Sequence, residues 1–159
     1  MRELCTTIAY TALALAYCLQ LALGFPVGYT DASLLPHLSF ALFHANVFHL
    51  AANILTLHLL QPTGRDLATG YLISLAASFA AVTAAPTVGF SGALYAIIGM
   101  RTTLFRGRFT APKAWFAAFL LAGLVLPRVN GLLHLLCFAA GAVVQFIRRT
   151  RDDYAKAGR

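Results

Sequence analysis

A serine lies among small residues in the stretch Gly89-Phe90-Ser91-Gly92, which follows a break at Pro86 in a long uncharged run. A serine hydroxyl attacks a carbonyl carbon only when a base accepts its proton, and histidine is the usual base near neutral pH. Small residues are also common where membrane helices pack closely, so Ser91 has a packing interpretation beside the chemical one. The choice between them depends on which polar residues the fold brings to this serine.

Polar side chains that could serve such a serine occur in two other apolar segments. They are His44, His49 and Asn53 in one segment and Asn130 and His134 in the other. His49 and Asn53 are four residues apart, so on a helix they share one face. The His134 imidazole is the candidate base for the serine proton. The His49 imidazole, the Asn53 amide and backbone N–H groups at a helix start near Ser91 could stabilise the negative oxygen of an attacked amide.

The composition indicates that these residues belong to a membrane protein. Of the 159 residues, 60% are hydrophobic and 11% are charged, whereas an average soluble domain has about 25% charged residues. Residues 4–30, 32–64, 67–100 and 129–147 contain no Asp, Glu, Lys or Arg. A soluble domain would need charges to cover its surface, so we predict an integral membrane protein with a single domain over residues 1–159.

Apolar runs and their breaks predict six membrane-spanning helices, at about residues 5–24, 44–60, 67–85, 91–105, 114–127 and 130–146. For the first run a cleaved signal peptide is the alternative, although its apolar region would normally be shorter, about 7–15 residues. Residues 25–43 contain two prolines, a glycine and an aspartate, and they predict an irregular, partly membrane-embedded loop in which His37 is solvated. The helix at 91–105 would be about 22 Å long, short of a hydrocarbon core of about 30 Å, so it either begins below the membrane surface or thins the bilayer.

The basic residues orient the predicted helices. With a cytoplasmic N-terminus, six spans place all but one of the 12 Lys and Arg residues at or near the cytoplasmic side, in agreement with the positive-inside rule. These residues are Arg2, Arg65, Arg101, Arg106, Arg108, Lys113, Arg148, Arg149, Arg151, Lys156 and Arg159, and the exception is Arg128. Both termini are then cytoplasmic, and His49, Ser91 and His134 come together on the outer side. No nucleic-acid partner is expected, because the basic residues form no stripe with aromatic residues.

The acidic residues do not supply a third catalytic group. Of the five Asp and Glu residues, four fall on the predicted cytoplasmic side and Asp31 falls in the first loop, so a Ser–His dyad is favoured over a triad. The Gly-x-Ser-x-Gly motif of soluble serine hydrolases is not matched, because Ala93 stands two residues after Ser91. The histidines show no His-x-x-x-His spacing and have no Glu partner, so neither a metal nor another cofactor is expected.

Taken together, these motifs resemble those of the rhomboid intramembrane serine proteases. The resemblance rests on His49-Leu50-Ala51-Ala52-Asn53, on Gly89-Phe90-Ser91-Gly92 followed by Tyr95, Ala96 and Gly99, and on His134 in the last helix. Their order and spacing are those of the family's minimal bacterial form, over all six predicted helices. The resemblance implies an all-α, six-transmembrane-helix rhomboid-like bundle, multi-pass in the bacterial inner membrane. It also implies cleavage of transmembrane protein substrates that enter between the second and fifth helices.

The resemblance further implies a role for each site residue. Ser91 would be the nucleophile, and His134 would be the general base and acid. His49 and Asn53 would stabilise the oxyanion, together with the backbone of Ser91. The supporting residues would be Tyr95, which packs against the catalytic imidazole, and His44, Gly89 and Gly92.

Departures from the family pattern and two rival functions accompany this assignment. Cys137 stands where the family commonly has a glycine on the last helix, although Gly141 is kept, and the first loop lacks the Trp-Arg pair of many members. An inactive rhomboid-like factor that binds or chaperones membrane segments is one rival, and it would be expected to lose Ser91 or His134. A specialised peptidase that trims C-terminal sorting tails is the other, and it would keep the same dyad.

Overall fold

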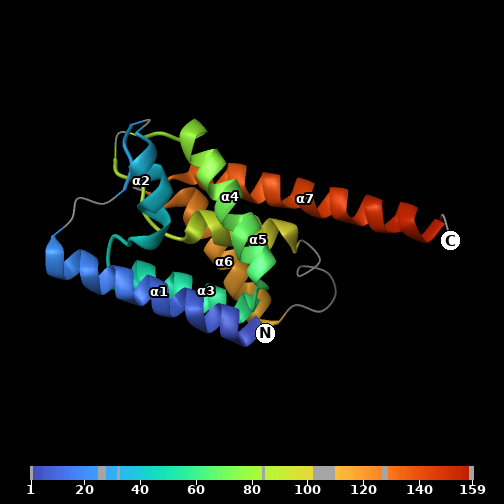
Figure 1. The fold of residues 1–159 in the computed structure, drawn as a ribbon, viewed down its shortest axis with the longest axis horizontal. Coiled ribbons are helices and arrows are strands. Elements are labelled where there is room, and N and C mark those ends of the chain that lie inside the picture. Colours follow the sequence, from blue (N-terminus) through green and yellow to red (C-terminus); the bar gives the residue numbers. More distant parts are fainter. Residues whose placement is uncertain are drawn as a thin grey trace.

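A computed structural model describes residues 2–24, 28–31, 33–83, 85–101, 110–126 and 129–157 of the chain. Within these ranges the fold is all-α, with one isolated antiparallel bridge between Tyr29 and Thr87 (Figure 1). The elements are α1 (Arg2–Leu23), α2 (Leu34–Ser39), the 3-10 helix η1 (Phe40–Leu42), α3 (Val47–Leu60), α4 (Gly64–Ala80), α5 (Ser91–Met100), α6 (Ala111–Val125) and α7 (Gly131–Ala157). Helices α1 and α7 run in roughly opposite directions along the long axis of the molecule (Figure 1).

Helix α5 is the core of the fold. All ten of its residues are buried, and it packs most extensively against α7 and α4. At about 1.5 Å per residue it is only about 15 Å long, half the thickness of a bilayer core. A helix that is hydrophobic all round can be surrounded by protein on every side, which matches this burial. The helix that begins at Ser91 is therefore enclosed by the other helices.

Small residues let α5 approach its neighbours closely. A Cβ atom added at Gly141 on α7 would overlap the backbone carbonyl oxygen of Ala96, and one added at Gly99 on α5 would overlap that of Phe138. Cys137 is fully buried at the same interface, where a Cβ at Gly92 would lie 3.5 Å from its sulfur. That distance is an ordinary contact, whereas the same Cβ would overlap the Ser74 hydroxyl on α4, so the absence of a side chain at Gly92 lets α4 come close to α5.

Two of the described helices, α1 and α7, are long and apolar enough to cross a membrane. The segments Leu34–Leu42 and Val47–Leu60 would form a third span if they are counted together, and they are bent by 74° at the break between them. Helices α5 and α6 are apolar but shorter than a full span. Helices of this length and composition are typical of a membrane protein. By length and composition, however, the described helices give two spans, or three with the bent pair, and not the six that the sequence predicts.

Local capping determines where α3 and α4 begin. The Asn46 side chain accepts the backbone N–H of His49 at 2.9 Å, so α3 starts at Val47 and not at 44 as predicted. Thr63 and Asp66 form a capping box, so α4 starts before the predicted residue 67. It ends at Ala80, before the predicted end at 85.

Two other sequence predictions on helix boundaries were wrong. Residues 34–42 are helical and form α2 and η1, although residues 25–43 were predicted to be irregular. Helix α7 continues to Ala157, past the predicted end at 146, since no Pro or Gly interrupts its basic tail. The predicted helix ends at 105 and 127 lie outside the described residues, as do Arg106, Arg108, Arg128 and Arg159.

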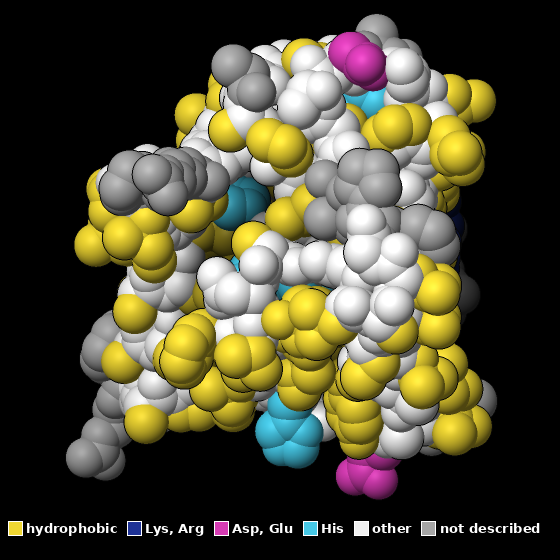
Figure 2. All heavy atoms as spheres, turned by 90° about the vertical axis from the view of Figure 1, so that its left-hand side faces the viewer, with side chains coloured by type: hydrophobic (Ala, Val, Ile, Leu, Met, Phe, Trp, Pro, Cys, Tyr) yellow, Lys and Arg dark blue, Asp and Glu magenta, His cyan; other side chains and the backbone are white. Residues whose placement is uncertain are grey.

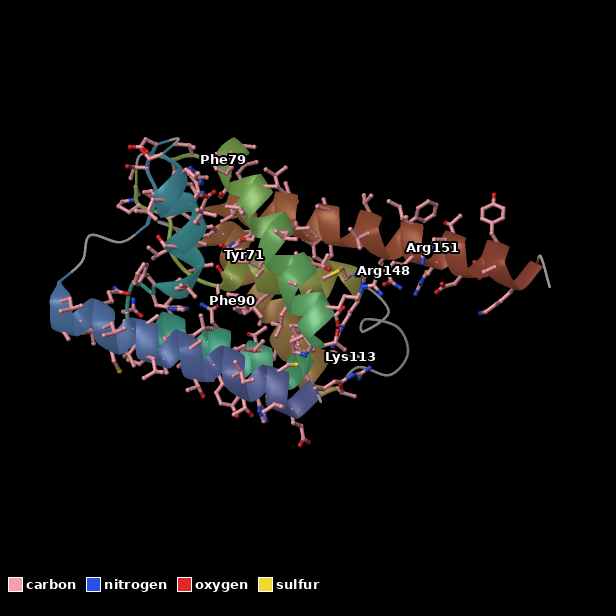
Figure 3. All side chains as sticks on the ribbon, in the orientation of Figure 1. Tyr71, Phe79, Phe90, Lys113, Arg148 and Arg151 are labelled. Carbon is pink, nitrogen blue, oxygen red and sulfur yellow. The ribbon has the colours of Figure 1, made fainter. Side chains whose placement is uncertain are left out.

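The prediction that His37 is solvated was also wrong, because its side chain is fully buried. Its ring stacks between those of Tyr29 and Phe79, with centroid distances of 4.2 and 4.0 Å. Its two nitrogens lie 2.6 Å from the Ser78 hydroxyl and 2.8 Å from the Asp31 carbonyl oxygen. The imidazole thus fastens α2 to the end of α4, where Figure 3 labels Phe79.

An ionic cluster joins helices at the other end of the molecule. Asp66 on α4 lies 2.7 Å from Arg101, just after α5, and 3.5 Å from Arg148 on α7. Arg101 also donates to the backbone carbonyl of Leu60, the last residue of α3. Figure 3 shows Arg148 in the half of the molecule that also holds Lys113, away from Phe79. The described basic and acidic groups of this cluster hold four helices together.

Candidate active site

Ser91 is the first residue of α5 and is only 7% exposed. The chain reaches it through Gly89, whose φ of +115° is a conformation that residues with a side chain rarely adopt. The N–H of Gly89 donates to the carbonyl of Phe40 in η1 at 3.0 Å, which fixes the loop before the serine. From this position the Ser91 hydroxyl oxygen lies 2.8 Å from Nε2 of His134 on α7.

The other ring nitrogen of His134 determines how that hydrogen bond is made. Nδ1 lies 2.9 Å from the backbone carbonyl oxygen of Gly123 on α6, in a buried contact. A carbonyl only accepts, so Nδ1 carries a hydrogen. In the neutral imidazole Nε2 is then an unprotonated acceptor that faces the Ser91 hydroxyl.

Tyr95 lies one turn after Ser91 and orients the imidazole from below. Its ring stacks on that of His134, with a centroid distance of 4.1 Å and an interplanar angle of 6°. The phenol donates to α6, where its oxygen is 2.5 Å from the Phe119 carbonyl oxygen and 2.8 Å from that of Leu120. Both stacked rings are therefore hydrogen-bonded to backbone carbonyls of α6.

His49 lies on the first turn of α3, and its ring approaches the segment that leads to Ser91. Its ring lies against Gly89, where an added Cβ would overlap it. Together with Ser91, Tyr95 and His134 it lines a cavity of about 710 Å³. Figure 2 shows the hollowed face at this end of the molecule, with histidine side chains visible between hydrophobic ones.

Asn53 and His44 are near His49 but do not line this cavity. Asn53, one helical turn after His49, is fully buried, and within the described residues neither atom of its amide has a hydrogen-bond partner. His44 is also fully buried, and its ring packs edge-on against that of His49 at a centroid distance of 5.2 Å. Gly92, the remaining predicted residue, faces Ser74 on α4 and not the cavity.

Asn130 organises the start of α7, one turn before His134. Its side-chain oxygen accepts the N–H of Leu133 at 3.0 Å, and its amide nitrogen donates to the carbonyl of Ala81 at 2.6 Å and to the Thr87 hydroxyl at 3.0 Å. Tyr29 is buried beside it, and burial raises the pKa of this phenol to about 12. The phenol donates to the same carbonyl at 3.3 Å.

The structure brings Ser91, His134, Tyr95 and His49 together, as the sequence predicts, and leaves Asn53 buried beside them. The sequence analysis counted Asn130 among the candidate polar residues without predicting its capping role, and it missed Gly123. An Asn just before an apolar run is a recognisable helix cap. A glycine inside an apolar helix is a weaker signal, since it is also explained by packing alone.

This arrangement can activate a hydroxyl and stabilise negative charge. The N–H groups of the first turn of α5 have no acceptors within that helix, and the His49 ring lies nearby against Gly89. Among the described residues no group of three or more His, Cys, Asp or Glu side chains could hold a metal ion.

No family model matches this chain, and no curated protein matches it.

Proposed function

We propose that this protein is an intramembrane serine endopeptidase of the rhomboid type, with Ser91 as nucleophile and His134 as general base and acid. The observation that carries the proposal is the 2.8 Å contact between the Ser91 hydroxyl and His134 Nε2, made by an imidazole whose Nδ1 is occupied by a carbonyl. Such a pairing leaves Nε2 free to take the serine proton, which is the activation that a serine nucleophile needs.

The reaction proceeds in two displacements. The Ser91 oxygen attacks the carbonyl carbon of a substrate amide while its proton passes to His134 Nε2. The new oxyanion is stabilised by N–H groups at the start of α5 and by the His49 ring. His134 then protonates the leaving amine, and the C–N bond breaks to leave an ester on Ser91. A water molecule, deprotonated by His134, hydrolyses that ester and restores the hydroxyl.

Asn53 has a conditional place in this scheme. Its amide is buried without a partner and does not line the cavity. It would stabilise the oxyanion once its side chain turned toward the substrate. Because the amide is unpaired in the free protein, its N–H group is available to donate to that oxyanion.

A transmembrane segment is the substrate class that fits this setting. The cavity is lined by residues of α3, such as Ala52, and of α6, such as Ala122. We infer that a substrate helix enters between these two helices and unwinds locally, because its amides are otherwise protected by helical hydrogen bonds. The proposal includes six spans in a bacterial inner membrane, with both termini in the cytoplasm. A dedicated sorting-tail peptidase would use the same site, whereas an inactive binding factor does not require the intact Ser91–His134 pair.

The test is covalent labelling of the detergent-purified protein with a fluorophosphonate probe, together with cleavage of a tagged single-span reporter in vesicles. We expect the wild type and the exposed-serine control Ser33→Ala to label and cleave, and Ser91→Ala and His134→Ala to do neither. Labelling that persists in Ser91→Ala would refute the assignment of the nucleophile. A wild-type protein that neither labels nor cleaves would refute the proposed activity.

A further inference from the structure

His134 is oriented by a backbone group of α6 and not by a carboxylate. Its Nδ1 faces the Gly123 carbonyl at 2.9 Å in a buried contact. The acidic residues of the chain lie on α1, in the first loop, at the start of α4 and in the tail of α7, away from this cavity. We propose that Gly123 is a positioning residue that takes the place of the third member of a catalytic triad. This inference rests on the proposed function.

The missing side chain at position 123 is required for this contact. A Cβ there would overlap the Tyr95 phenol oxygen and would lie 2.6 Å from His134 Nδ1. Glycine inside a helix costs about 1 kcal/mol relative to alanine, so its presence in α6 calls for a reason. The reason is that only glycine lets the α6 backbone come close enough for its carbonyl to accept from the imidazole.

The Gly123 carbonyl is available because it lies in the last turn of α6, which ends at Val125. The last four carbonyls of a helix have no intrahelical donor. The residue four positions further on is Pro127, which has no N–H to donate in any conformation. The C-terminal end of a helix also carries partial negative charge, so it stabilises the imidazolium that forms when His134 takes the serine proton.

The same helix holds the ring on which His134 stacks. The Tyr95 phenol donates to carbonyls one turn earlier in α6, at Phe119 and Leu120. Helix α6 therefore contacts both rings through main-chain oxygens. A displacement of α6 would release the imidazole and the phenol together, so the position of this helix sets whether Nε2 faces the serine.

The first test is Gly123→Ala, with Gly64→Ala as the matched control. At Gly64 an added Cβ meets only the Cys5 sulfur, at an ordinary 3.5 Å. We expect Gly123→Ala to lower the turnover number for the reporter by about 10²-fold or more, as small misplacements of catalytic groups do, with little change in KM. Gly64→Ala should keep wild-type turnover. Wild-type turnover in Gly123→Ala would overturn the inference.

A second variant and a spectroscopic measurement separate positioning from misfolding. The double variant Gly123→Ala with Tyr95→Phe removes the phenol oxygen that the new methyl group would overlap, and it is compared with Tyr95→Phe alone. In 15N-histidine-labelled protein we expect a downfield Nδ1–H signal that is absent from His134→Ala, retained in Tyr95→Phe and lost in the folded double variant. A double variant that keeps both the signal and the turnover of Tyr95→Phe would overturn the inference.

The two proposals fail differently. If the wild type labels with the probe while His134 is protonated on Nε2, then the role of Gly123 is refuted and the proposed activity stands. If the Nδ1–H signal is present and the protein neither labels nor cleaves, then the proposed activity is refuted.

Discussion

The buried side chain of Asn53 destabilises the folded protein, because its amide is unpaired. It is fully buried on α3, and within the described residues both atoms of its amide lack hydrogen-bond partners. A buried polar group left unsatisfied costs about 1–3 kcal/mol. By contrast, Asn46 at the start of the same helix is paired with the His49 N–H. An uncompensated amide one turn from His49 is expected of a group that is used during a reaction and not in holding the fold.

Replacement of Asn53 by leucine should therefore make the protein more stable and less active. Asn53→Leu keeps the approximate volume and removes the unpaired amide, so we expect the free energy of unfolding to rise by about 1–2 kcal/mol. Turnover of the reporter should fall by about 10²-fold, as for loss of an oxyanion donor. Asn46→Ala, the contrasting variant, should lower stability by about 1 kcal/mol. Thermal unfolding and reporter cleavage measure both, and unchanged turnover in Asn53→Leu would exclude the oxyanion role.

At the scale of elements, the contact between α5 and α7 holds Ser91 and His134 together. Ser91 lies at the first residue of α5, and His134 lies one turn into α7. Below them the two helices touch where Gly141 meets the backbone of Ala96. A Cβ at Gly141 would meet main-chain atoms of Ala96, so no side-chain rotation could make room for it.

Gly141→Ala should consequently separate the helices and disturb the site. Overpacking of a close contact costs about 1–3 kcal/mol, and we expect a loss of stability in that range. Because the same two helices carry Ser91 and His134, fluorophosphonate labelling should slow as well. The same substitution at Gly64, where a Cβ fits, should leave labelling unchanged. Unfolding in a denaturing detergent series and labelling time courses would show the difference, and a Gly141→Ala protein of wild-type stability would contradict the packing.

Some elements were predictable from the sequence, and others depend on distant residues. Apolar runs predicted helices where α1, α3, α5 and α6 lie, because burial or lipid exposure leaves a local signature. The prediction for the first loop was wrong, since His37 is buried not only by nearby Tyr29 but by Ser78 and Phe79, which are remote in sequence. The pairing of Ser91 with His134 was foreseen from residue types. The contact with Gly123 was not, because it is made by a backbone carbonyl, which every residue possesses.

At the scale of the whole molecule, helix length and charge are coupled. Helix α1 has 22 residues, about 33 Å, and α7 has 27 residues, about 40 Å, against a hydrocarbon core of about 30 Å. The excess length of α7 carries Arg148, Arg149, Arg151 and Lys156 beyond an apolar stretch. Arg148 pairs with Asp66 there, so one end of the bundle is rich in charge, whereas the face in Figure 2 shows mostly hydrophobic and uncharged side chains.

This asymmetry predicts the topology that the proposed function requires. Alkaline phosphatase, which is active only outside the cytoplasm, should be active when fused between α1 and α2 at residue 31 and inactive when fused between α3 and α4 at residue 62. A fluorescent protein fused after α7 should fluoresce, because its C-terminal attachment would be cytoplasmic. Basic residues near helix ends favour this orientation. Active phosphatase at residue 62 would mean that Leu34–Leu42 and Val47–Leu60 do not bring the chain back across the membrane, and the six-span proposal would then fail.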